Sequence, residues 1–225
     1  MIAMATLANT GGYSEHDPLS LDLRLRRARL GLAVGAIGIL MLFISFTSAY
    51  IVRQGLPTLD PHTNTLVRDW FPVPLPALLF LNTAVLLISS VTMELARMQV
   101  RHTSRSAVAS IPGVSAGPDK TVIWLALSLV LGLGFLRGQW IAWRELSTSG
   151  FYIATSASSS FVYLLTGTHA VHLLGGVLAL LVAVAAAAFR RSATSRAVLL
   201  DVTAWYWHFM TVLWIYILCL LEFAQ

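Results

Sequence analysis

The sequence predicts an all-α fold: a polytopic membrane bundle of five transmembrane helices, with its N-terminus inside and its C-terminus outside. Of its 225 residues, 57% are hydrophobic and only 11% are charged, whereas a soluble domain carries about a quarter charged residues. This composition cannot build a water-facing surface. The apolar residues also gather in five long stretches, each near the roughly 20 residues that cross about 30 Å of hydrocarbon.

The basic residues set the predicted orientation. Eleven of them lie before the first stretch, between the second and third, or between the fourth and fifth: Arg24, Arg26, Arg27, Arg29, Arg97, Arg101, Arg105, Lys120, Arg190, Arg191 and Arg196. The other connections hold only Arg53, Arg68 and Arg144, and Arg137 lies inside the third stretch. Cytoplasmic loops are rich in Lys and Arg, so the N-terminus is expected inside. Basic loops that face anionic lipid also explain the net charge of +5, so we expect no nucleic-acid partner.

The elements follow in order along the chain. Residues 1–28 are polar, end in a basic run and precede an apolar stretch too long for a cleaved signal, so they are expected to form a cytoplasmic N-terminal segment. Residues 29–225 are expected to form one membrane domain, with spans near 29–52, 76–97, 121–143, 159–189 and 200–223. Pro72, Pro74 and Pro76 break the chain before the second span. The fourth span is overlong and should tilt.

Five polar side chains inside the spans are the candidate functional residues. Asn82 lies in the second span, Gln139 in the third, His169 and His172 on one face of the fourth, and His208 in the fifth. An ionisable group near the middle of a membrane helix costs about 3 kcal/mol on insertion scales, so it should face protein or water. Hydrogen bonding between helices is the favoured interpretation, and ligation of a haem or metal by the three histidines is the alternative.

Composition limits the metal alternative. The single cysteine, Cys219, excludes an internal disulfide and any site that needs several thiolates. Carboxylates fall near the ends of the spans rather than beside the histidines: Glu94, Glu145, Asp201 and Glu222. A solute transporter is disfavoured because no midplane charge pair or interrupted helix is evident.

Short motifs recur through four spans in order. They are Leu81–Thr83 with Ser89–Thr92, Leu131–Gly132 with Phe135–Leu136 and Gln139, Leu165–Gly167 with His169, His172 and Gly176, and Tyr206–Phe209 with Trp214. With these motifs the chain resembles subunit III of the haem–copper oxidases, over roughly residues 29–223, in a short form of five helices. Many members of that family have two further helices at the N-terminus.

Three positions depart from the family pattern. Ile39 stands where the family often has Glu in the first of these five helices, so a proton-handling role for that carboxylate is not carried over. Ala142 replaces a Glu and Thr211 replaces an Asp. The two extra helices form one wall of a lipid-holding cleft in longer members, and here another chain or bulk lipid would supply that wall.

The resemblance implies a non-redox integral subunit of a proton-translocating cytochrome c oxidase, with no catalytic centre, metal or cofactor of its own. Haems and copper would belong to partner subunits I and II. This chain would pack on subunit I, bind phospholipid and support sustained proton uptake during oxygen reduction in aerobic respiration. The expected location is the bacterial cytoplasmic membrane, and a larger respiratory supercomplex is a further possible setting.

The resemblance also assigns roles to particular residues. A structural hydrogen-bond motif is expected from Asn82, Gln139, His169, His172, Trp207 and His208. His172 and Arg190 are the candidates for lipid contact. The alternatives left open are an accessory subunit of a quinol oxidase or nitric oxide reductase, and a stand-alone membrane protein that binds a haem or metal through histidines.

Overall fold

Five long helices make up almost all of the structure, a computed structural model that describes residues 18–59, 65–67, 70–109, 120–153, 155–189 and 193–223. The helices are α1 (Pro18–Gly55), α2 (Leu78–Ala109), α3 (Thr121–Thr148), α4 (Ala157–Ala188) and α5 (Ala193–Phe223). Each is long and apolar enough to cross a membrane. The predicted five-helix membrane bundle is therefore confirmed.

The helices run past the predicted ends of the spans. α1 begins at Pro18 rather than near residue 29, and α2 continues to Ala109 rather than stopping near 97. The apolar stretch marks only the part of a helix that lies in hydrocarbon. Leu, Arg and Gln are good helix formers, so both helices continue into their basic flanks. Between α1 and α2, Thr58–Leu59 (β1) pairs antiparallel with Leu66–Val67 (β2).

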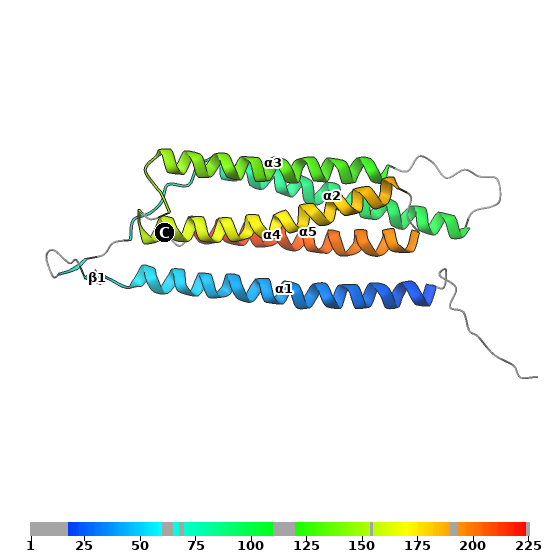
Figure 1. The fold of residues 1–225 in the computed structure, drawn as a ribbon, viewed down its shortest axis with the longest axis horizontal. Coiled ribbons are helices and arrows are strands. Elements are labelled where there is room, and N and C mark those ends of the chain that lie inside the picture. The colour runs from blue at the N-terminus through cyan, green and yellow to red at the C-terminus, as the bar shows by residue number, and fades with distance from the viewer. Residues whose placement is uncertain are drawn as a thin grey trace, which may run out of the picture.

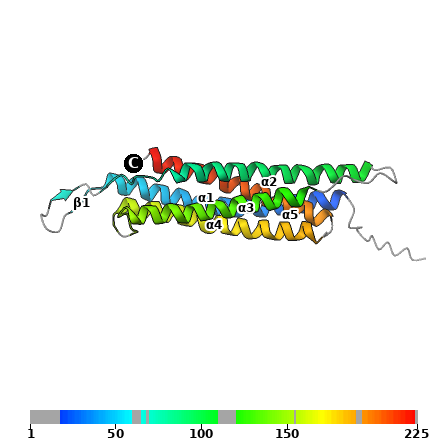
Figure 2. The same ribbon diagram turned by 90° about the horizontal axis from the view of Figure 1, so that it is seen from above.

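The helices lie side by side and alternate in direction (Figures 1 and 2). The N-terminal end of α1 and the C-terminal end of α5 therefore lie at opposite ends of the bundle (Figure 1). α2 and α3 share the most extensive contact, while α5 packs on α1, α2 and α4. Among the described helices, α1 contacts only α4 and α5, and it stands along one side of the other four (Figure 1).

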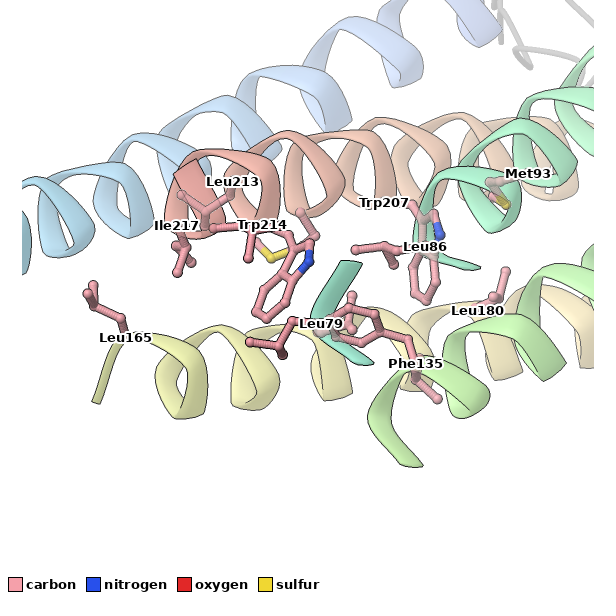
Figure 3. Packing of buried hydrophobic residues seen from close by; sticks show 14 of the residues in the cluster. Leu79, Leu86, Met93, Phe135, Leu165, Leu180, Trp207, Leu213, Trp214 and Ile217 are labelled. Atoms are coloured by element: carbon pink, nitrogen blue, oxygen red, sulfur yellow. The ribbon is translucent and has the colours of Figure 1, made fainter. Parts of the chain in front are cut away.

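The core is centred on two tryptophans of α5. Trp207 and Trp214 are fully buried, and both indoles point into the bundle (Figure 3). The ring of Trp214 meets that of Phe135 on α3 edge to face, with centroids 4.9 Å apart. Aromatic pairs in this geometry contribute about 1 kcal/mol beyond their buried area.

Two glycines make room for Trp207. A Cβ atom at Gly132 on α3 would lie 2.7 Å from Cη2 of Trp207, and one at Gly176 on α4 would lie 3.3 Å from the same ring. Apolar burial gives helices little drive to associate in lipid, so close backbone approach and dispersion contacts must hold them together. The indole thus fills space that the two glycines leave between α3, α4 and α5.

We predict that Gly132→Ala destabilises the bundle by about 1–3 kcal/mol, because the added methyl group would lie 2.7 Å from the fully buried Trp207 ring. The measurement is SDS-driven unfolding in mixed micelles. Gly134→Ala is the matched control on the same helix, since a Cβ there meets nothing within 4 Å. Equal stability of the two variants would contradict this account of the packing.

Candidate functional site

Hydroxyl groups of α2 join α3 and α5 inside the bundle. The Ser89 hydroxyl donates to the backbone carbonyl of Ser128 on α3 (2.9 Å) and accepts a hydrogen bond from Nε1 of Trp207 on α5 (3.1 Å). Thr92 and Ser128 pair through their hydroxyls at 2.8 Å. Ser89 on α2 therefore accepts the indole N–H of Trp207 on α5 and also bonds to α3. These contacts fix how the three helices are rotated against one another.

Asn82 forms a second link between α2 and α3. Its side-chain amide donates to the backbone carbonyl of Phe135 at 3.2 Å, and the side chain is buried. Gly138 leaves the space for it, since a Cβ atom there would overlap the Asn82 amide. Nearby, Nε1 of Trp214 donates to the Thr83 hydroxyl at 2.9 Å. The asparagine N–H group and the indole N–H groups of both tryptophans thus find acceptors within the protein.

A network of charged side chains lies near the end of the bundle where α1 begins. The Asp201 carboxylate accepts hydrogen bonds from Arg29 of α1 (2.7 Å) and Arg97 of α2 (3.1 Å). Arg97 also donates to Glu94 at 3.0 Å. The same carboxylate oxygen of Glu94 lies 3.1 Å from Nε2 of His208 on α5.

The centre of the network is shielded from solvent, whereas the side chains of Arg29 and Glu94 at its margins are 45% and 36% exposed. The side chains of Asp201 and Arg97 are 6% and 11% exposed, and the guanidinium of Arg97 lies 5.6 Å from the ring centroid of Trp205. Two arginines face two carboxylates, which is the condition under which charges are tolerated away from water. The network therefore ties α1 and α5 to α2 by polar contacts.

Glu94 and Asp201 were expected near the ends of the spans, and the hydropathy pattern did not predict this network. A signal was present, because Glu94 and Arg97 are three residues apart on one helix face, and Asp201 lies seven residues before His208. That these two faces meet depends on the rotation of α2 against α5, which the pattern does not give.

The predicted motif residues do not form one connected set. His208 joins the charged network, with its Nδ1 2.5 Å from the Ser90 hydroxyl. His169 is fully buried against the rings of Phe135 and Trp214, and in the described structure neither of its ring nitrogens has a hydrogen-bond partner. Gln139 is likewise buried, and its Oε1 has none.

His172 lies at the junction of three helices. Its Nδ1 is 2.8 Å from the carbonyl of Thr168 one turn earlier, and its ring meets Phe43 of α1 at 6.2 Å. Its own carbonyl accepts a hydrogen bond from the Tyr206 hydroxyl of α5 at 2.8 Å. The other candidate for lipid contact, Arg190, lies outside the described residues.

The histidines are not arranged as a ligand set. Both nitrogens of His208 are already within hydrogen-bond distance of Ser90 and Glu94. Within the described ranges, no group of three His, Cys, Asp or Glu side chains could hold a metal ion. The hydrogen bonds of Asn82, Ser89 and Asp201 instead join one helix to another.

An apolar groove of about 490 Å³ lies between α1 and α5. Leu32 and Ala33 form its α1 side, Trp205 and Phe209 form its α5 side, and Arg29 and His208 of the charged network contribute to its wall.

Five apolar helices joined by buried hydroxyl, amide, imidazole and ion-pair contacts define a multi-pass integral membrane protein. The family model for cytochrome c oxidase subunit III matches residues 24–223. The chain belongs to this family, which confirms the resemblance indicated by the motifs.

Individual relatives agree with the family match. The chain is 33% identical to the probable cytochrome c oxidase subunit 3 of Mycobacterium leprae over 102 residues, which are 45% of this chain and 50% of that protein. It is 29% identical to cytochrome c oxidase subunit 3 of Branchiostoma lanceolatum over 194 residues, 84% of this chain and 66% of that protein. The chain thus spans about half the length of the mycobacterial relative and about two thirds of the lancelet one.

We predict that Asp201→Asn lowers the free energy of unfolding by about 1–3 kcal/mol, because Arg97 and Arg29 would then share a neutral acceptor in a largely dry site. The measurement is SDS-driven unfolding, combined with cross-linking of cysteines placed at the α1–α5 contact. Glu145→Gln, which alters an exposed carboxylate near the end of α3 and at the opposite end of the bundle, serves as the control. If α1 cross-links to α5 as efficiently in the variant, the network does not hold α1.

Proposed function

We propose that this chain is the non-redox integral subunit III of a haem–copper terminal oxidase, specifically a cytochrome c oxidase. It packs on subunit I, holds phospholipid and sustains proton uptake during oxygen reduction, while subunits I and II carry the haems and copper. The single observation that carries the proposal is the family match across all five helices, residues 24–223.

The contacts of the motif residues support a structural role. Asn82 bonds to the α3 backbone, Trp207 donates to Ser89, and His208 lies between Ser90 and Glu94. These contacts join one helix to another, at about 1 kcal/mol per bond. Such residues give a partner subunit a rigid surface, and electron transfer is left to the partner's centres.

The α1–α5 groove supports the proposed lipid function. Its floor is apolar, and Arg29 places a half-exposed guanidinium in its wall. Because Ile39 stands where the family often has a carboxylate, the contribution of this chain to proton uptake is indirect. It keeps lipid and the adjoining helices in place beside the subunit that conducts protons.

The test is purification of the tagged chain from its native membrane in mild detergent. We expect subunits I and II of a cytochrome c oxidase to co-purify, with haem absorption that stays with them when the subunits are separated. Co-purified quinol oxidase or nitric oxide reductase subunits would support the accessory alternative. A Soret band or one equivalent of metal on the separated chain would overturn the proposal.

We predict that His172→Ala shortens the turnover lifetime of the complex and reduces its retained phospholipid. The substitution removes the ring contact with Phe43, an aromatic pair of the kind that contributes about 1 kcal/mol, and so loosens α1 against α4. The readouts are the number of turnovers before inactivation and the phosphorus content of the purified complex. Val171→Ala, at an exposed position on the same helix, is the control and should change neither.

A further inference from the structure

A second groove, of about 480 Å³, lies at the opposite end of the bundle from the charged network. It is bounded by the last turns of α3, the connection after it, and the first turns of α4. Its lining comprises Trp140, Trp143, Arg144 and Ser147 of α3, Tyr152 and Ile153 of the connection, and Tyr163 of α4.

The walls of this groove are fixed by hydrogen bonds and ring contacts. Nε1 of Trp143 donates to the Thr166 hydroxyl at 3.0 Å, and the Tyr163 hydroxyl donates to the carbonyl of Phe151 at 3.0 Å. The ring centroids of Trp143 and Trp140 are 6.4 Å apart, as are those of Trp143 and Tyr163. The aromatic wall is therefore preorganised.

The connecting segment is anchored as well. The Ser159 and Ser160 hydroxyls donate to the carbonyls of Tyr152 and Ile153, respectively. The turn that brings this segment back toward α3 passes through Gly150, whose φ of +89° lies in a region that other residues rarely adopt. The Ile153 side chain, 65% exposed, is thus held in an open position beside the groove.

Arg144 carries a charge that the groove leaves available. It is exposed, and in the described part of the chain its guanidinium has no hydrogen-bond or ion-pair partner. An unpaired guanidinium offers several N–H donors in a plane, a geometry that matches the oxygens of a phosphate.

The depth of the groove matches the headgroup region of a bilayer. α3 has 28 residues and is therefore about 42 Å long, longer than the roughly 30 Å of hydrocarbon. Arg144 lies four residues before its end. Tryptophan and tyrosine gather at this level in membrane proteins because their rings are amphipathic. A lipid molecule at this depth presents its phosphate beside Arg144 and its acyl chains toward the bilayer interior.

We propose that this groove binds one phospholipid, with the phosphodiester on the Arg144 guanidinium and an acyl chain along Trp140 and Ile153. Arg144 is the charged residue among those that line the groove, so its side chain supplies the charged contact. The Ser147 hydroxyl, which also lines the groove, donates to the Arg144 carbonyl. The site extends the lipid-binding part of the proposed function to the membrane face away from the basic loops. His172 is not among the residues that line it, and its test does not depend on oxidase turnover.

The experiment is native mass spectrometry of the full-length chain, in the complex in which it purifies, after exchange into nanodiscs. The probes are palmitoyl-oleoyl phosphatidylglycerol, the matching phosphatidylcholine, and the diacylglycerol with the same chains. Both phospholipids are expected to be retained and the diacylglycerol lost. Arg144→Gln should weaken retention of one phospholipid by about tenfold or more, because hydrogen bonds to a charged group are lost.

Arg137→Gln is the matched control, since it removes the same charge from an exposed position seven residues earlier on α3 and outside the groove. Equal loss in both arginine variants, or undiminished retention in Arg144→Gln, would overturn the proposal, as would equal retention of diacylglycerol. A photoreactive amino acid at position 153 identifies the occupant in cells. Capture of a phospholipid supports the proposal, and capture of a polypeptide overturns it.

Discussion

A polar side chain inside a membrane needs a partner within the protein, and the arrangement of this bundle depends on that constraint. Asp201 shows it most clearly, because its carboxylate receives hydrogen bonds from arginines of two other helices. Water could satisfy each of these charges at a soluble surface, where such pairs contribute little. Here the Asp201 side chain is only 6% exposed, so its charge is stabilised by the two arginines. These ion pairs join α1, α2 and α5.

The constraint also explains how α1 is attached. α1 is the least buried of the five spans and contacts only α4 and α5 among the described helices. Its apolar face gains little from leaving lipid for protein. The Arg29–Asp201 ion pair, the Phe43–His172 ring contact, and a hydrogen bond from the Tyr216 hydroxyl to Thr47 at 2.9 Å therefore supply specific contacts along its length.

The five helices and their order could be predicted from hydropathy, because each span must be long enough to cross the bilayer. The motifs assigned Asn82 and Trp207 to a structural hydrogen-bond motif, and both side chains are buried. The helix ends could not be predicted, since α1 and α2 continue through polar flanks that hydropathy excludes. Nor could the partners of Glu94, Arg97 and Asp201 be predicted, because they depend on how far each helix is rotated about its axis. His169 and Gln139 were expected to form hydrogen bonds, yet burial alone is what the described structure shows for the His169 ring and the Gln139 carbonyl oxygen.

The packing of Trp207 between Gly132 and Gly176 brings together three positions that are far apart in the chain. A Cβ atom added at Gly132 would clash with the indole at 2.7 Å, and one added at Gly176 would make a tight contact with it at 3.3 Å, whereas a smaller side chain at position 207 would leave a void. A change of side-chain volume at one of the three positions is thus best tolerated when the other two change in a compensating way. Homologues that replace the tryptophan should therefore carry bulkier side chains on the neighbouring helices, a covariation that sequence comparison alone could detect.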